Sequence, residues 1–403
     1  MKLTNNINYK ILSIVALSVL SQTAQAIPFA FEGRSLGMGG VSVATADLAT
    51  AAWANPAMLT NQRPHDDFSL LIGAGAFLRD DDDLVTDIED FQDADDRRQA
   101  AENAGDLIAE GDALLEMSQI ISRLEGKVIA PEVTGIAAMG MAFDSFAMAV
   151  SIRGDAIGGG TVTDLSCDIT EAGCDPNEIV SDQYNILNIE GVLATEIGVS
   201  LARDFRLLNK KVSIGIKPKL VDLEVFTFRE SILSTSSGLS NINDEDTQFH
   251  LDTFYTVDLG AAVDLSRSFR LGLNVRNLLT DKFDVAGQTL NFDTEVRIGV
   301  AYRNKFLTLA ADYDLVENEP LLANPSFDGL KTQYIALGAE FNAFDFAQLR
   351  VGARKNIASG ISSGAKNTAY TAGIGFWLGF NLDIAATLTD NSVGGFVQTG
   401  FRF

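Results

Sequence analysis

Few side chains in this 403-residue chain are placed for acid–base, nucleophilic or metal chemistry. The two histidines, His65 and His250, lie in no recognisable nucleophile or metal-binding motif. The members of a serine–histidine–aspartate site need not be neighbours in sequence, so that class of site stays open. We predict no catalytic residue, no cofactor and no metal site, and we expect that the protein is not an enzyme.

The two cysteines, Cys167 and Cys174, have six residues between them in a loop-like stretch. They do not form a C-x-x-C redox motif, and with only two histidines in the chain they do not form a plausible zinc cage. In an oxidising compartment they could close a small disulfide loop. A pair of free thiols is the alternative.

The N-terminus indicates export from the cytoplasm. Lys2 and Lys10 precede an apolar run over 11–20, and the small residues Ala24-Gln25-Ala26 follow. This pattern predicts a secretory signal peptide over 1–26. No stretch of the chain approaches the roughly 20 apolar residues that a transmembrane helix needs, so a membrane location would require a β-barrel.

The chain is strongly acidic. Its net charge of −24 becomes −26 when the two lysines of the signal peptide leave. Phosphate backbones bind lysine and arginine, so nucleic acid is not an expected partner. Solvated acidic loops are the simplest explanation of the charge.

From Phe68 onward, segments of about ten residues alternate between apolar and polar positions. In one of them Leu307, Leu309 and Tyr313 share a face, and Asp312 and Asp314 share the other. The expected strands are 68–78, 133–143, 145–153, 191–203, 211–228, 250–264, 268–277, 293–303, 305–315, 331–341, 348–355, 368–380, 381–389 and 395–403. Short and long connections alternate between them. We predict an all-β fold, a transmembrane antiparallel outer-membrane β-barrel of about 14 strands at 68–403.

The last strand ends on Phe401 and Phe403, which alternate with polar and small residues as in a closing barrel strand. We expect these two aromatics to act as a C-terminal assembly signal. The expected partners are therefore outer-membrane lipid and the barrel assembly machinery, and the barrel is expected to be a monomer.

Charged residues recur on the polar faces of the strands and are expected to point into the lumen, because charges facing lipid are costly. Structural pairing is one role for them, and selectivity is another. The charged residues predicted to line the lumen are Arg270, Arg276, Arg297, Asp312, Asp314 and Arg350.

Two segments depart from this simple alternation. In 211–228 the apolar parity switches after Pro218, which predicts a bulge near Lys217 to Leu220, with two short strands as the alternative. The acidic segment 79–132 begins with Asp80 to Asp83 and then carries apolar residues at helical spacing. We expect one or two amphipathic helices folded over the outer mouth as an extracellular insertion. The aspartates could bind divalent cations, although they lack a calcium-loop pattern.

Residues 27–67 are rich in small residues and should fold inside the barrel as a plug. They contain Gly33-Arg34-Ser35-Leu36-Gly37-Met38-Gly39-Gly40, where glycine permits close backbone approach, and Asn55-Pro56-Ala57, where proline ends a short helical run. Plug and gating roles are expected for Gly37, Gly39, Gly40, Asn55, Pro56 and Ala57. An inert, tightly packed plug is the alternative.

This segment, the strand rhythm and the terminal phenylalanine resemble the FadL family of outer-membrane transporters of hydrophobic compounds. The resemblance implies passive uptake or exchange of a small hydrophobic ligand, and a lateral opening in the wall for which Gly135 and Gly140 of a small-residue strand are candidates. Within the superfamily, Ile27-Pro28-Phe29 and the glycine-rich run are similar to the subgroup labelled TraF-like conjugal transfer proteins. A structural role in an envelope apparatus such as conjugal transfer is therefore the second hypothesis.

Overall fold

The computed structural model describes residues 32–61, 67–80, 83–170, 173–233, 249–250, 253–279, 281–285, 288–319, 322–323, 331–343, 346–359, 368–389 and 392–403. The predicted signal peptide 1–26 and the first five residues of the predicted plug lie outside these ranges. His65 lies outside them as well. No helix in the described ranges is long and apolar enough to cross a membrane.

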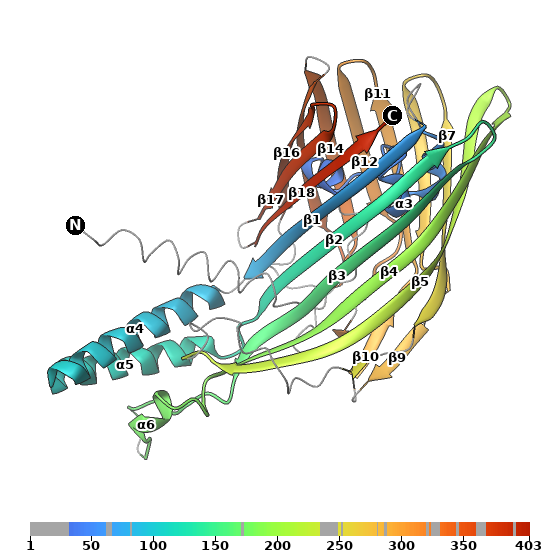
Figure 1. The fold of residues 1–403 in the computed structure, drawn as a ribbon. Helices are drawn as coiled ribbons and strands as arrows, with labels where there is room; N and C mark the ends of the chain where they lie inside the picture. The colour runs from blue at the N-terminus through green and yellow to red at the C-terminus, as the bar shows by residue number, and fades with distance from the viewer. Residues whose placement is uncertain are drawn as a thin grey trace.

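Fourteen antiparallel strands form a closed barrel (Figure 1). They are β1 (Phe68–Asp80), β2 (Ile129–Ala142), β3 (Ala147–Thr163), β4 (Ile186–Leu207), β5 (Lys210–Ser231), β7 (Phe254–Asp264), β8 (Phe269–Arg276), β11 (Glu295–Arg303), β12 (Leu307–Asp314), β14 (Tyr334–Ala343), β15 (Ala347–Asn356), β16 (Thr368–Trp377), β17 (Asn381–Leu388) and β18 (Ser392–Arg402). Each strand pairs with its neighbour in the chain, and β1 pairs with β18 to close the ring. The prediction of a 14-strand antiparallel barrel is confirmed.

The two faces of each strand follow the alternation in the sequence. Leu271 and Val300 are 41% and 39% exposed on the outside, whereas Arg297 is 4% exposed and faces inward. An apolar outer face suits lipid, and a polar inner face suits a lumen. This is the fold of an outer-membrane β-barrel.

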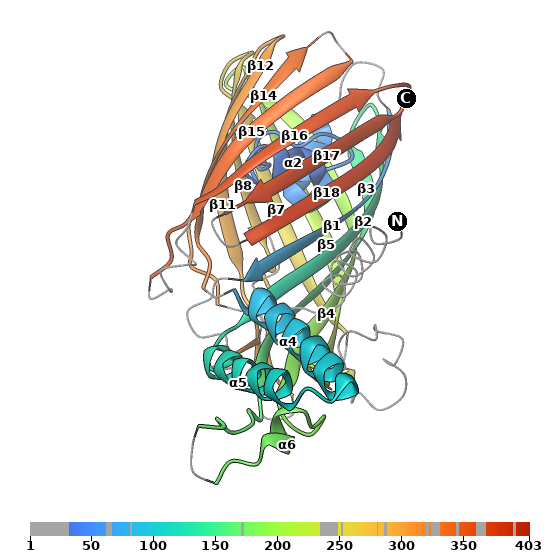
Figure 2. The same cartoon turned by 90° about the vertical axis from the view of Figure 1, so that its left-hand side faces the viewer.

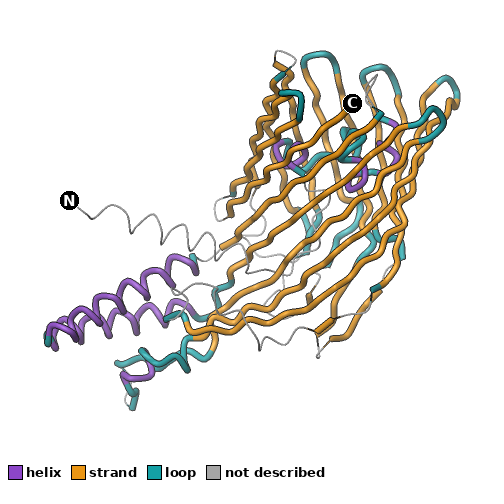
Figure 3. The backbone as a smooth tube through the Cα atoms, viewed as in Figure 1, coloured by secondary structure: helices purple, strands orange, loops and turns teal. Residues whose placement is uncertain are grey.

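The two ends of the barrel differ (Figure 3). One end has short turns, such as Leu208-Asn209, where both residues have positive φ as in a type I′ hairpin. The other end has the long connections and a small sheet of β9 (Asp281–Val285), β10 (Gln288–Phe292) and β13 (Leu322–Ala323). The two-residue β6 (Phe249–His250) extends the pairing of β5 there. Outer-membrane barrels place short turns on the periplasmic side and long loops outside.

Two helices, α4 (Leu84–Ala104) and α5 (Leu107–Leu124), lie in the predicted insertion, and α6 (Pro176–Ile179) lies in the next loop. Figures 1 and 2 show α4 and α5 side by side, projecting beyond the long-loop end of the barrel. Their buried apolar residues, including Phe91 and Met117, join Val162 and Leu187 at the ends of β3 and β4 in one cluster. This cluster holds the base of the helix pair against the barrel.

The predicted bulge near Lys217 to Leu220 is wrong. Lys211 to Val221 pair one for one with β7, and the pairing of β5 with β4 has the same register on both sides of Pro218. The apolar parity switches for another reason. β5 has 22 residues, about twice the 9–11 that cross a bilayer, so its outer half lies beyond the lipid. There Val221, Leu223 and Val225 face inward and are buried.

Residues 32–61 of the predicted plug lie inside the barrel (Figure 2). It contains α2 (Gly33–Gly37), α3 (Ala51–Ala54) and the 3₁₀-helix η1 (Pro56–Thr60). Leu36, Trp53 and Leu59 are at most 3% exposed and share a core with inward-facing Leu71 and Phe396 of the barrel wall. This shared core explains why so short a segment is ordered without a fold of its own.

Candidate functional site

The ends of the plug helices are fixed by side chains within the plug. Glu32 caps α2, because its two carboxylate oxygens accept from the backbone N–H groups of Ser35 (2.7 Å) and Arg34 (2.8 Å). Asn55 caps η1 by accepting from the N–H of Ala57 at 3.0 Å, and Pro56 occupies the first helical position. Predicted gating residues Asn55, Pro56 and Ala57 therefore form one turn.

Glycines of the barrel wall face the plug in cross-strand pairs. Gly215 is paired with Gly260, Gly272 with Gly299, and Gly338 with Gly352. A Cβ atom at Gly260 would lie 2.1 Å from Asn55 Oδ1, and one at Gly338 would lie 2.2 Å from the carbonyl oxygen of Met38. Real Cβ atoms do not approach so closely. Each glycine pair thus leaves a niche that plug backbone fills.

Gly37 and Gly39 of the plug also lie too close to the barrel wall for a side chain. Gly39 has a φ of +76°, and a Cβ atom there would lie 2.6 Å from the carbonyl oxygen of Leu337. A Cβ atom at Gly37 would lie 3.1 Å from the backbone of Gly373. Gly40, with a φ of +90°, has open space beside it. Gly37 and Gly39 therefore allow close contact with the wall, whereas Gly40 serves the turn.

Hydrogen bonds join the plug backbone to barrel side chains from widely separated strands. Asp312 accepts from the N–H groups of Ser42 (2.7 Å) and Val43 (3.1 Å). Gly39 donates its N–H to Thr371 Oγ1 at 2.8 Å, and Gly33 donates to Gln398 Oε1 at 2.8 Å. The bonds from Gly33, Ser42 and Val43 satisfy plug N–H groups that have no acceptor within the described part of the plug, whereas Gly39 N–H also donates to the carbonyl oxygen of Leu36 at 3.1 Å.

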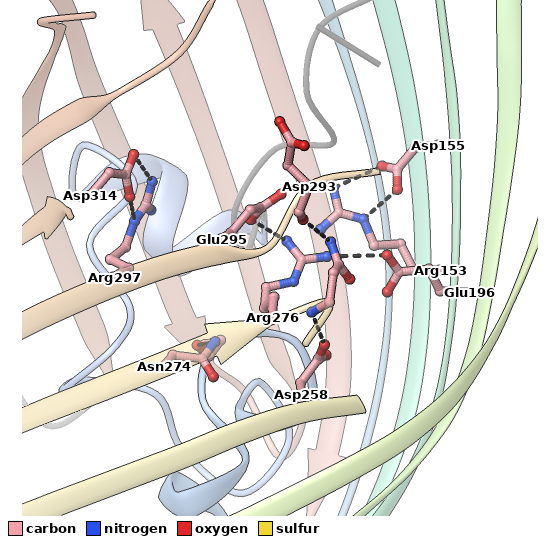
Figure 4. Close-up of polar contacts among 12 residues, drawn as sticks. Arg153, Asp155, Glu196, Asp258, Asn274, Arg276, Asp293, Glu295, Arg297 and Asp314 are labelled. Atoms are coloured by element: carbon pink, nitrogen blue, oxygen red, sulfur yellow. Dashed lines mark hydrogen bonds and ion pairs between the residues drawn. The ribbon is translucent and has the colours of Figure 1, made fainter. Parts of the chain in front are cut away.

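A layer of buried ion pairs crosses the lumen on the long-loop side of the plug (Figure 4). Arg276 bridges Glu196 (3.2 Å) and Glu295 (3.3 Å), and Lys219 bridges Glu196 (3.0 Å) and Asp258 (3.1 Å). Further pairs are Arg153 with Asp155 at 2.6 Å and Arg297 with Asp314. Buried ion pairs add little net stability, but removal of one partner leaves an uncompensated charge. The layer therefore constrains geometry more than it stabilises the barrel.

Beyond the charged layer, the inner wall of β3, β4 and β5 becomes apolar. The side chains there face inward and are fully buried: Ile157, Val192, Ala194, Val221 and Leu223. Along β5 the inward series runs from Gly215 at the plug, through Lys217 and Lys219, to Val221 and Leu223. The lumen is thus divided along its length into a plug, a charged layer and an apolar stretch of wall.

A second group of ion pairs lies on the short-turn side of the plug. Arg34 of α2 pairs with Glu340 at 2.7 Å and donates to the carbonyl oxygen of Thr45 at 2.6 Å. Arg350 pairs with the same glutamate at 2.9 Å and also with Asp383. Arg270 pairs with Asp264 at 2.5 Å. Through Arg34, the contacts of Glu340, Arg350 and Asp383 join the plug electrostatically to β14, β15 and β17, whereas the Arg270–Asp264 pair joins β8 to β7.

Burial also changes the acidity of a plug carboxyl group. Glu32 is 2% exposed, and desolvation raises its pKa to about 7, against the partial opposing effect of nearby Arg34. Nearby Asp383 and Asp47 act in the same direction as burial. Glu32 therefore titrates near neutral pH, where most carboxyl groups are fully ionised.

All six predicted lumen charges face inward, namely Arg270, Arg276, Arg297, Asp312, Asp314 and Arg350.

The two predicted wall glycines lie on opposite faces of β2. A Cβ atom at Gly140 would lie 2.8 Å from the carbonyl oxygen of Leu48 in the plug, whereas Gly135 is on the exposed face with nothing within 4 Å. Only Gly140 is placed to contact the plug.

The chain end closes the ring of strands. Phe401 and Phe403 are 45% and 67% exposed, and the ring of Phe403 stacks on Phe68 of β1 with centroids 5.6 Å apart.

In the second long loop, Cys167 and Cys174 are joined in a disulfide. No group of metal-ligating side chains is assembled among the residues that the structure describes.

The niche glycines were not singled out from the sequence, and neither was the role of Asp312 as an acceptor for the plug. The sequence does contain a pattern that could have identified the niche glycines. Five glycines lie within strands, at positions whose parity is that of the inward face: Gly215, Gly260, Gly272, Gly299 and Gly338. Glycine weakens a strand, so its recurrence on one face indicates close approach of another backbone.

Comparisons with known proteins agree with this architecture. Residues 52–314 match a family model described as "F plasmid transfer operon, TraF, protein". No curated protein matches the chain. Among solved structures, the chain resembles the Ralstonia pickettii toluene transporter TbuX (TM-score 0.53, 13% identity, 93% of this chain and 99% of that chain).

Two further structures have the same fold. The P. putida toluene transporter TodX aligns with a TM-score of 0.51 at 12% identity, over 96% of this chain and 99% of its own. A Pseudomonas aeruginosa FadL homologue aligns with a TM-score of 0.53 at 10% identity, over 94% and 98%. At these identities the likeness establishes the fold, a plugged outer-membrane barrel.

Proposed function

The chain belongs to the family described as the F plasmid transfer operon TraF protein, and from this premise and its barrel fold we propose that it is an outer-membrane channel. Its role is the passive uptake or exchange of a small hydrophobic compound. The similar structures TbuX and TodX are named as toluene transporters, so the proposed ligand has the size of a monoaromatic hydrocarbon.

The observation that carries this proposal is the apolar inner wall of β3 to β5. A water-filled lumen would favour polar side chains at inward positions. Positions 192, 221 and 223 face inward, yet they hold apolar residues that are fully buried, namely Val192, Val221 and Leu223. Ligand pockets for apolar compounds are lined mainly by such side chains. We assign the ligand's contact surface to this stretch of wall, which a ligand reaches when the segments packed against it move apart.

Passage through the barrel requires no covalent chemistry. The ligand binds the apolar wall, and it moves on when the plug shifts within its glycine niches. Gly140 of β2 is the proposed point of lateral exit, because its contact with Leu48 would be lost when the plug moves. Gly135 has no part in this route, since it faces away from the plug.

Uptake of radiolabelled toluene by cells tests the assignment. The variant Val192→Thr with Val221→Thr keeps the side-chain shape but replaces one methyl group of each valine by a hydroxyl group. It should lower uptake by about tenfold, or about 1.4 kcal/mol. The matched control is Val199→Thr, which makes the same change on β4 at a lipid-facing residue that is 40% exposed. Equal uptake in wild type and in both variants would contradict the proposal.

The second candidate function is that of a structural component of an envelope apparatus for conjugal transfer. The family description and the projecting acidic pair of helices α4 and α5 support it. In that case removal of 84–124 would abolish transfer of a conjugative plasmid, and the threonine variants would not affect it. In the channel proposal the same threonine variants lower toluene uptake, so the two functions give opposite results.

A further inference from the structure

A cavity of about 590 Å³ lies at the short-turn end of the lumen, beneath the plug. Its walls come from the plug, through Arg34 and Thr45, and from the barrel between Asp264 and Gln348. It is on the opposite side of the plug from the apolar stretch of β3 to β5. A volume of this size is within the range of pockets that hold small organic ligands.

The cavity is basic although the protein is strongly acidic. It is lined by five cationic side chains and one carboxylate, that of Asp264, whereas the whole chain has 54 acidic and 30 basic residues. The five are Arg34, Arg267, Arg270, Arg303 and Lys305. Arg34 comes from the plug, Arg267 and Arg270 from the β7–β8 turn and the start of β8, and Arg303 and Lys305 from the end of β11 and the β11–β12 turn. The fold thus gathers them from distant parts of the sequence.

One buried polar group in the wall also lacks a partner. Thr308 is 1% exposed, lines the cavity, and its hydroxyl oxygen forms no hydrogen bond with any described residue. A buried hydroxyl without a partner is costly, whereas a ligand or water in the cavity would satisfy it. Guanidinium groups bind carboxylate and phosphate oxygens in a planar, two-bonded geometry. Arg34 and Arg270 already pair with Glu340 and Asp264, and the lining still has an excess of positive charge, so the cavity offers an anion both charge and the Thr308 hydroxyl.

We propose that this cavity binds a small organic anion with two or more carboxylate or phosphate groups, which enters from the short-turn side. Arg267 and Arg303 are exposed residues at the rim, and Thr308 lies deeper. Arg34 is the plug's own contribution to the wall, and it is held by Glu340 and Thr45. A bound anion would thus contact both the barrel and the plug. The site does not depend on what crosses the channel.

Titration calorimetry of the full-length barrel in an uncharged detergent tests this site, with citrate as the tricarboxylate probe and pyrophosphate in a parallel experiment. Citrate should bind, and its uncharged trimethyl ester should not. The double variant Arg267→Gln with Arg303→Gln should weaken the binding by about tenfold or more. Tighter binding of citrate than of pyrophosphate identifies carboxylates as the preferred groups, and the reverse order identifies phosphates.

The matched control is Arg206→Gln, which removes an exposed arginine near another turn at the same end, outside the cavity. It should leave citrate affinity unchanged. Migration of the unboiled protein on a gel reports whether each variant is folded. Absence of binding to both probes at millimolar concentration, or an equal loss in Arg206→Gln, would overturn the proposal.

Discussion

Adding one methyl group to the wall at Gly338 should displace the plug. The new Cβ atom would lie 2.2 Å from the carbonyl oxygen of Met38, and ordinary contact begins at 3.4 Å, so one backbone must move by about 1.2 Å. Overpacking of this kind costs about 1–3 kcal/mol. A shift this large would also break the adjacent bond from Gly39 N–H to Thr371 Oγ1, at about 1 kcal/mol.

The variant Gly338→Ala should therefore weaken plug binding by about 2–4 kcal/mol, or by a factor of about 30 at the lower limit. Conductance in planar lipid bilayers is the first readout, because displacement of the plug removes the segment that fills the lumen on the short-turn side of the charged layer and should raise the conductance. Fluorescence gives a second readout. Trp53 in the plug is 3% exposed, and in a Trp377→Phe background its emission should shift to the red when the plug leaves.

The control is Gly135→Ala, which adds the same methyl group to a strand glycine with nothing within 4 Å. This variant should conduct as wild type does. Wild-type conductance and wild-type fluorescence in Gly338→Ala, with normal assembly of the barrel, would refute the reasoning that the glycine pairs hold the plug.

Three further predictions concern the end of the chain, the lumen face and the plug carboxyl. Deletion of Phe403 removes the stacking on Phe68 and three backbone hydrogen bonds where the last strand meets the first. Less heat-modifiable protein should therefore reach the outer membrane. An amount equal to that of wild type would contradict this prediction. Cysteine at position 270 should react with a hydrophilic maleimide from the short-turn side, whereas cysteine at position 271 should react only with lipid-soluble reagents, and the reverse would invert the strand parity. Burial raises the pKa of Glu32 from 4.5 to about 7, so between these pH values the plug in place binds a proton that the displaced plug does not. The free energy that holds the plug in place should therefore fall by about 3 kcal/mol as the pH rises from 4.5 to 7. Trp53 emission should report this change, and Glu32→Gln should abolish it.

The barrel could be predicted because its signal is local. Each strand needs lipid on one side and lumen on the other, so period-two alternation at Leu307 to Tyr313 reports the orientation of every side chain directly. The same logic correctly placed Arg270 and Asp312 inside. It failed at Val221 and Leu223, because the rule of an apolar outer face holds only within the bilayer and β5 extends beyond it.

The contacts of the plug could not be predicted, because they join residues hundreds of positions apart. Nothing near Gly338 or Gly352 in sequence indicates that Met38 lies between their strands and the lumen axis. The same holds for Asp312, whose two plug donors are 270 and 269 residues away. Composition predicts a segment small enough to fit inside the barrel, and only the fold shows which wall residues make room for it.

The plug also constrains the order of events when the chain folds. Gly33 is synthesised before nearly all of the barrel, yet its N–H binds Gln398 on the last strand, 365 residues later. Contacts at such separation form slowly, since a very long loop must close before any of them is gained. Once β18 has paired with β1, the niches at Gly215, Gly272 and Gly338 lie in a continuous wall. We therefore expect the early segment to be in place before the ring closes, with the later strands pairing around it.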